Sequence, residues 1–263
     1  MVTIVTDGAV SGGSSGGSWS KLYEVDFTSI AIQDLQSGGD GTKTIDGNSW
    51  SVFSATNCSA ASIGANGLEC TFNTASHSAL GFGADVLASD LSSSFDIGLP
   101  TRIFLLFETN AARNAESMGV RMVEGRSTVG FASSTRQQIT SFFGIYNTTQ
   151  WRAPVGFGHD SAATGNAPSG YQNSTNTSAL MLEVSGGAAK TVLFKGASGL
   201  LTELPTDPST GTITSAQTYG GTTATTSPPL LSSDVAIQLH AWAGNTTGGF
   251  NPKFKAFSLW QFS

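Results

Sequence analysis

The stretch VAIQLHAWAGNTTGGFNPKFKAFSLWQF, residues 235–262, contains two apolar runs joined by a segment rich in Gly and Asn. Successive side chains of a β-strand point to opposite faces, so a repeat of two residues assigns one face to the core. The first run has this repeat, and its core-facing residues are expected to be Val235, Ile237, Leu239 and Ala241. The second run is apolar on both faces, with Phe257 and Leu259 on one and Phe254, Trp260 and Phe262 on the other. Both runs predict strands, and the second must be covered on both faces, by the chain or by a partner.

Similar runs fill most of the chain. We predict strands at 21–28, 49–56, 67–73, 101–109, 118–125, 128–134, 139–147, 180–186, 190–196, 235–244 and 253–262. The 3.6-residue repeat of a helix is absent, apart from a short helical turn at 84–91. Because the crossover helices of a parallel sheet are missing, the sequence predicts an all-β antiparallel jelly-roll sandwich. Two long polar segments, 159–178 and 202–229, are predicted as loops.

Composition excludes some classes of protein. The 263 residues carry a formal net charge of −6, and the 12 Lys and Arg residues form no cluster, which argues against nucleic-acid binding. Charged residues make up only 11%, while Gly reaches 32 residues, as in many extracellular and viral β proteins. We expect no signal peptide, since the first ten residues lack a basic region and Asp7 interrupts their apolar stretch. The longest apolar run, at 103–107, is too short to span a membrane.

The first 18 residues differ from the rest. Residues 11–18, SGGSSGGS, are typical of a flexible tether that spans about 15 Å on average. Ahead of them, Val2, Ile4 and Val5 form a short β-prone segment that cannot fold alone but could add a strand to another chain's sheet edge or bundle with copies of itself. We therefore predict an anchoring arm and tether at 1–18 and one sandwich domain at 19–263. The alternative for residues 1–18 is a disordered tail or an expression remnant.

Candidate catalytic groups are few. Glu24 and Asp26 come closest to the paired carboxylates of a glycosidase strand, but no second glutamate follows them. They alternate with apolar residues and are expected to form a solvent-facing edge. The three histidines are not accompanied by a serine in a G-x-S-x-G nucleophile elbow, because the matches to that pattern, at 12–16 and 13–17, lie in the Gly/Ser tether. We expect no enzymatic activity.

Metal and disulfide chemistry stays open. Asp40, Asp46 and Asn48 offer oxygen donors for calcium, although ordinary Asp-Gly turn chemistry explains them as well. We expect no other cofactor. Cys70 should point into the core of its strand as a thiol, with a Cys58–Cys70 disulfide as the alternative.

Two groups of residues are candidates for binding. Gln238, His240 and Trp242 should line the exposed face of strand 235–244, and amide, imidazole and indole groups together suit a sugar. The other group, Tyr146, Trp151 and Arg152, lies on or beside a predicted hairpin tip. The alternative, which we favour, is that both groups cover a sheet or pack against a second subunit.

The two ends of the domain carry a resemblance. WSKLYEVDFTSI and DGNSWSVFSA near the start, with VAIQLHAWAG and FKAFSLWQF at the close, resemble a concanavalin A-like (laminin G-like) jelly roll. That resemblance implies first and last strands that lie side by side. A version with an N-terminal arm, low charge and no secretion signal is most similar to surface proteins of tailed bacteriophages.

The resemblance implies a non-enzymatic virion surface protein, either a capsid decoration or a fibre. It would be made in the host cytoplasm and anchored by its arm to other virion proteins. We expect a homo-oligomer, with a trimer favoured, possible contact with a host glycan, and no membrane insertion. The alternative is a carbohydrate-binding lectin module or a receptor-binding adhesin.

Overall fold

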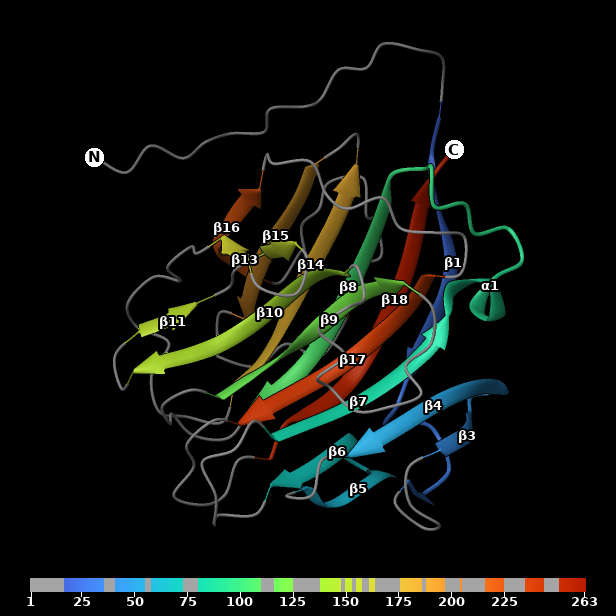
Figure 1. Ribbon diagram of the computed structural model, residues 1–263, viewed down its shortest axis with the longest axis vertical. Helices are drawn as coiled ribbons and strands as arrows, with labels where there is room; N and C mark the ends of the chain where they lie inside the picture. The colour runs from blue at the N-terminus through green and yellow to red at the C-terminus, as the bar shows by residue number, and fades with distance from the viewer. Residues whose placement is uncertain are drawn as a thin grey trace.

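The computed structural model describes residues 17–35, 41–54, 58–72, 80–109, 116–124, 138–147, 150–152, 155–157, 161–163, 176–185, 188–196, 204, 216–224, 235–243 and 251–263. Within these residues the chain forms two antiparallel sheets, and Figure 1 shows one in front of the other. We name each sheet after its central strand, β18 or β17. The predicted antiparallel jelly-roll sandwich is confirmed.

The β18 sheet holds both ends of the described chain. In spatial order its strands are β16 (Ala216–Ala224), β15 (Ala188–Gly196), β14 (Asn176–Ser185), β8 (Thr101–Thr109), β18 (Lys253–Phe262), β6 (Gly67–Phe72), β5 (Cys58–Gly64) and β2 (Gln33–Asp34). The first strand, β1 (Trp19–Asp26), pairs with β18 alongside β6. The first and last strands therefore lie side by side, as the resemblance implied.

The β17 sheet forms the other layer. Its order is β13 (Ser161–Ala163), β12 (Val155–Phe157), β10 (Gln138–Asn147), β9 (Glu116–Glu124), β17 (Val235–Ala243), β7 (Leu80–Leu87), β4 (Asn48–Ser54) and β3 (Gly41–Ile45). A short strand, β11 (Gln150–Arg152), pairs with β10. The helix α1 (Ala88–Leu91) follows β7 directly. No helix in the described part of the chain is long and apolar enough to cross a membrane.

The main core fills the space between the sheets. The four core-facing residues predicted on β17 are all fully buried in it: Val235, Ile237, Leu239 and Ala241. At one end Phe27, Trp50 and Phe257 meet as an aromatic group, with ring centroids 5.8 to 6.3 Å apart. Cys70 is a buried thiol of the same core, as expected.

A second apolar cluster covers the outer face of the β18 sheet. It consists of Phe104, Leu106, Ala179, Met181, Val192, Phe194, Ala256 and Trp260, with Trp19 and Leu204 packed against it. The chain itself therefore buries both faces of β18, and Trp260 is only 7% exposed. The prediction that Phe254 shares a face with Trp260 is wrong, because a bulge between Phe254 and Ala256 shifts the alternation by one residue.

Several predicted boundaries change. The helical turn is confirmed only at Ala88–Leu91, because Ala84 and Val86 continue β7 into the core. The loop predicted at 202–229 is wrong at β16, where a polar, Gly-containing segment is held as a strand by its pairing with β15. The loop predicted at 159–178 likewise contains β13 and the start of β14. The strand predicted at 128–134 lies outside the described residues.

Candidate functional site

The outer face of the β17 sheet is organised around the central strand β17. This strand pairs with β7 on one side and with β9 on the other. Because its odd-numbered residues enter the core, Gln238, His240 and Trp242 occupy positions on the opposite face. Cross-strand pairing sorts their neighbours into three rows, which we name after these residues.

The Gln238 row is polar. Gln238 lies opposite Asp85 of β7 and Arg121 of β9, so a carboxylate, an amide and a guanidinium occupy adjacent positions across three strands. Asp85 is completely buried and Gln238 is only 4% exposed. Burying charged groups in this way costs free energy unless they are paired and hydrogen-bonded.

The His240 row places glycine on both sides of the imidazole. His240 lies opposite Gly83 of β7 and Gly119 of β9. Gly83 is in turn opposite Phe53 of β4, and the Phe53 ring lies directly over it, where a side chain would otherwise stand. Phe142 of β10 occupies the matching position beyond Gly119. The row therefore alternates aromatic, glycine, histidine, glycine, aromatic.

The exposure predicted for two of the site residues is wrong. His240 is 1% exposed and Gln238 is 4% exposed, so neither reaches the solvent. A repeat of two residues identifies the face a side chain takes, but it does not show whether that face is covered. The role of these residues as ligand or subunit contacts stays a prediction, and it needs access that this conformation does not give.

Burial also sets the protonation of this face. Burial lowers the pKa of Arg121 to about 10, which leaves the guanidinium charged at neutral pH. Burial, and then the positive charge of Arg121, lower the pKa of His240 well below its usual value. His240 is therefore a neutral imidazole at neutral pH, a form in which one ring nitrogen is a potential donor and the other a potential acceptor.

The Trp242 row brings the two groups of predicted site residues together. Trp242 lies opposite Gly81 of β7 and Ser117 of β9. Ser117 pairs with Gly144 of β10, and Gly144 pairs with Arg152 of β11. Trp242 and Arg152 thus share one row, three strands and about 14 Å apart. The two positions between them hold only small residues.

The other two hairpin candidates lie next to this row. Trp151 pairs with Ile145 of β10, one position from Arg152, and Tyr146 follows Ile145 on the same strand. The β10–β11 hairpin therefore places Tyr146, Trp151 and Arg152 at one edge of the β17 sheet. The sequence indicated the hairpin but not its proximity to Trp242, which depends on β9 lying between β10 and β17.

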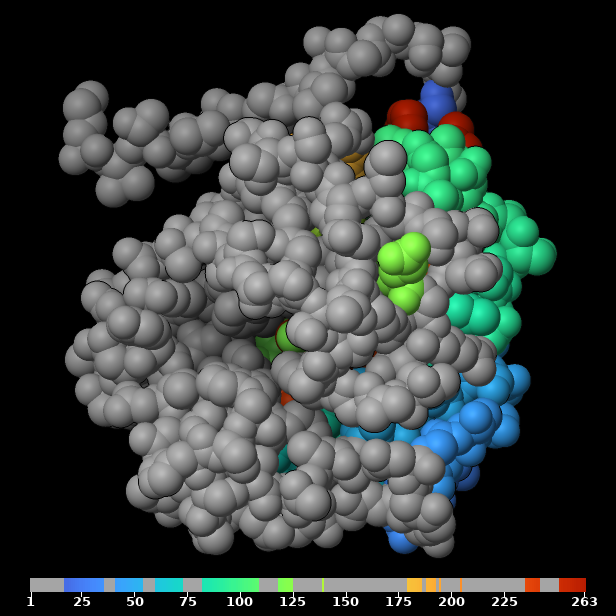
Figure 2. Space-filling model, viewed as in Figure 1, coloured from blue at the N-terminus to red at the C-terminus, as the bar shows by residue number. Residues whose placement is uncertain are grey.

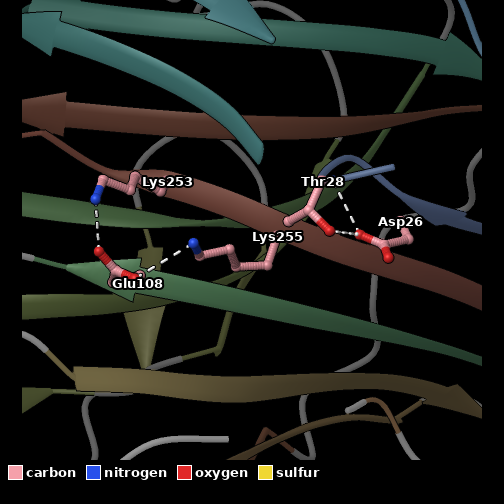
Figure 3. Close-up of polar contacts among 5 residues, drawn as sticks. All are labelled: Asp26, Thr28, Glu108, Lys253 and Lys255. Atoms are coloured by element: carbon pink, nitrogen blue, oxygen red, sulfur yellow. Dashed lines mark hydrogen bonds and ion pairs between the residues drawn. The ribbon is translucent and has the colours of Figure 1, made fainter. Parts of the chain in front are cut away.

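Glu24 and Asp26 have structural partners. Glu24 forms a 2.8 Å ion pair with Lys21. Asp26 accepts hydrogen bonds from the backbone amide and the hydroxyl of Thr28, at 2.9 and 2.6 Å, which close the turn after β1 (Figure 3). Both carboxylates are exposed and alternate with the buried Val25, so the predicted solvent-facing edge is confirmed.

A second polar cluster lies on the outer face of the β18 sheet. Glu108 of β8 pairs with Lys253 at 2.6 Å and with Lys255 at 3.3 Å (Figure 3). The two ammonium groups lower the pKa of Glu108 although burial alone would raise it. This cluster ties β8 to β18 and leaves the carboxylate fully engaged.

The calcium candidates are explained by a hairpin turn. Asp46 and Gly47 both have positive φ, 48° and 74°, as a two-residue turn between β3 and β4 requires. The Tyr23 hydroxyl donates to Asp46 at 2.8 Å, and the Asn48 amide donates to the Asp46 carbonyl at 2.9 Å. Burial, and then Asp46, raise the pKa of Tyr23. These groups bond one another and do not gather the six or more oxygens that calcium takes.

Among the described residues, no other metal donors are assembled into a site. Asp40 lies outside the described residues. The described part of the chain contains no group of three or more His, Cys, Asp and Glu side chains that could hold a metal ion.

Sequence reasoning did not find Phe53, Asp85 and Arg121. A signal existed for Asp85, which stands alone as a charge in LGFGADVL between the apolar Ala84 and Val86. A charge on a strand that is otherwise apolar indicates a second, polar face. Arg121, in the same row, occupies a similar position between Val120 and Met122. Nothing in either segment shows that the two strands flank β17.

Comparisons with known proteins define the fold. No family model matches the chain, and no curated protein matches it in sequence. The chain is similar to lectin II from Ulex europaeus, with 11% identity, a TM-score of 0.53 and coverage of 93% of this chain and 100% of the lectin. It is also similar to a protein of unknown function from Shewanella oneidensis MR-1, with 14% identity, a TM-score of 0.52 and coverage of 95% and 89%.

A third similar structure comes from a phage. It is the CBM2 module of the evolved Dit of Lactobacillus casei BL23 phage J-1, with 10% identity, a TM-score of 0.49 and coverage of 94% and 98%. The likeness to lectin II, together with the sheet topology, shows that the chain has a concanavalin A-like jelly-roll fold.

Proposed function

We propose that the chain is a non-enzymatic virion surface protein, in which a lectin-like head is held by the N-terminal arm. The observation that supports this most directly is the position of the two ends of the head. Ser18 and Ser263 form a backbone pair, with hydrogen bonds of 2.9 and 3.2 Å. Figure 2 shows the first and last described residues next to each other at one end of the molecule.

This geometry suits a tethered head. A tether joined at Gly17 meets the head at the end of the sandwich where Ser18 lies. The opposite end of the sandwich then points away from the point of attachment. The arm residues Val2, Ile4 and Val5 supply the β-prone segment that a sheet edge of another virion protein would bind.

The Trp242 row is the proposed contact with a host glycan. Among the similar structures, lectin UEA-II was solved in complex with galactose. In this chain Trp242 and Arg152 occupy one row of paired positions, with Ser117 and Gly144 between them. Indole and guanidinium groups are suited to stack against a sugar ring and to bond its hydroxyls. A free lectin module without a virion partner is the second candidate, and this same row favours it.

Catalysis is not part of the proposal. The only carboxylate pair that sequence motifs suggested is engaged by Lys21 and Thr28 on an edge strand. Incubation with capsular polysaccharides tests this point, and release of reducing ends would contradict it.

Deletion of residues 1–16 tests the attachment. Gly17 and Ser18 are kept because Ser18 belongs to the backbone pair with Ser263. We expect the truncated protein to fold with unchanged melting temperature and to be lost from particles that contain the intact protein. The matched control changes Asp7→Asn in the full chain and should be incorporated normally, whereas Ile4→Asp should not. Normal occupancy by the truncated head would place attachment in the head.

A further inference from the structure

The junction between the tether and the head is closely packed. Gly17 lies against the Phe262 ring so tightly that an added Cβ would fall 2.6 and 2.8 Å from two ring carbons. The next residue, Ser18, forms the backbone pair with Ser263. The chain therefore enters the head at a fixed point, directly beside the last strand.

Trp19, the first residue of β1, is held from two sides. Its ring makes an edge-to-face contact with Phe262, with centroids 5.6 Å apart and planes at 63°. The guanidinium carbon of Arg102 lies 4.4 Å from the Trp19 ring centroid. Arg102 also donates to Glu183 at 2.6 Å, and both of these side chains are largely buried.

These contacts continue as one row across the β18 sheet. Lys21, Trp260, Arg102 and Glu183 occupy paired positions on β1, β18, β8 and β14. The Lys21 ammonium lies 5.6 Å from the Trp260 ring, and the Trp260 indole donates to Ser258 at 2.9 Å. Side-chain contacts therefore link the start of β1, directly after the tether, to β14, which lies three strands away in the β18 sheet.

The direction of β1 decides how tension on the tether would act. β1 begins beside the last residues of β18, at the end where the C-terminus lies, and runs antiparallel to β18 away from that end (Figure 1). The hydrogen bonds of an antiparallel pair are perpendicular to the strands. A pull on residue 17 along β1 therefore loads all the pairs from Trp19–Phe262 to Asp26–Ala256 together, instead of opening them one at a time.

We propose that this junction is a mechanical clamp, in which Trp19, Phe262 and Arg102 lock β1 against β18 and pass tension on the tether into the β18 sheet. The inference rests on the proposed function in one respect: an anchored head that binds a surface is under tension. The clamp itself belongs to the isolated chain. Its strength can be measured without any particle.

Force spectroscopy on the full chain tests the clamp. One handle is attached at the N-terminus and the other at Asn66→Cys, an exposed site in the β5–β6 turn, in a Cys58→Ser background. β6 follows β1 along the same side of β18, so this pair of handles pulls along β1. We expect Trp19→Ala to shorten the lifetime at constant force by about tenfold, the factor expected from losing an edge-to-face pair and a cation–π contact together.

Two variants keep the result interpretable. Ile45→Val lies in β3 of the other sheet, away from the line of force, and should leave the lifetime unchanged despite its lower equilibrium stability. Trp19→Phe retains an aromatic ring and should fall between wild type and Trp19→Ala. Equal lifetimes for Trp19→Ala and Ile45→Val would overturn the clamp. That result would not affect the proposal that the arm is incorporated into particles. Conversely, failure of incorporation would not change the measured lifetimes.

Discussion

Gly83 on β7 provides a direct test of the packing described for the outer face of the β17 sheet. The Phe53 ring occupies the space above Gly83, next to His240 in the same row. In Gly83→Ala the new Cβ would lie within 2.8 Å of three Phe53 ring carbons. Phe53 is only 4% exposed, so its ring cannot move aside without disturbing neighbours.

The loss of unfolding free energy expected for Gly83→Ala is the difference between two opposing effects. Overpacking a buried site costs about 1–3 kcal/mol, and the depth of this overlap favours the upper end of that range. Replacing Gly by Ala within a strand returns about 0.5–1 kcal/mol of backbone entropy. We therefore expect Gly83→Ala to lower the free energy of unfolding by about 2 kcal/mol.

Urea unfolding of the full chain measures this loss as a lower midpoint at unchanged m-value. Gly64→Ala is the matched control, because nothing lies within 4 Å of its added Cβ and its φ is not positive. That control should be neutral or slightly stabilising. In a Phe53→Ala background the cost of Gly83→Ala should disappear. If Gly83→Ala is as mild as Gly64→Ala in the wild-type background, the reasoning is refuted.

Three further predictions concern buried and row residues. Among the described residues, the buried indole nitrogen of Trp50 has no hydrogen-bond partner. Trp50→Phe should therefore lower the free energy of unfolding in urea by only about 1 kcal/mol, because removal of the unsatisfied donor offsets the cost of the cavity. A loss of about 3–5 kcal/mol, as expected for a Phe257→Ala truncation, would contradict this. The pKa of His240 is lower in the folded than in the unfolded chain, so its contribution to stability is complete above the unfolded pKa of about 6.5 and is lost as pH falls below it. His240→Gln should therefore flatten the dependence of stability on pH below about pH 6.5, and a profile unchanged by the substitution would show a solvated histidine. Trp242→Ala should weaken adsorption to cells about tenfold with particle assembly intact, whereas a lower melting temperature of an oligomer would assign the row to a subunit interface.

The sequence patterns predicted which residues face the core better than they predicted features that depend on how the strands pair. The repeat of two residues in β17 correctly assigned Val235, Ile237, Leu239 and Ala241 to the core, because alternation is a local property of an extended chain. The same repeat misplaced Phe254, since a bulge depends on how β18 pairs with β8. It also missed β16, whose strand conformation comes from pairing with β15 and not from its own polar residues.

In the candidate site, too, the alternation within a strand could be predicted and the neighbours on other strands could not. The sequence indicated that Gln238, His240 and Trp242 share one face of β17, and the strand confirms this alternation. It could not show that Asp85 and Arg121 flank Gln238, because β7, β9 and β17 are neighbours only in space. Burial of His240 and the shared row of Trp242 and Arg152 likewise depend on strand order, which cannot be read from the residue pattern of a single strand.

Anchoring of the head to a virion by residues 1–18 is tested most directly by fusing these residues to a monomeric fluorescent protein. The fusion is supplied during assembly of particles that contain the intact chain. We expect purified particles to carry the fusion, and a fusion with Val2, Ile4 and Val5 changed to Asp to be absent from them. Particles without fluorescence, in a preparation where the intact chain is incorporated, would show that residues 1–18 are not the anchor.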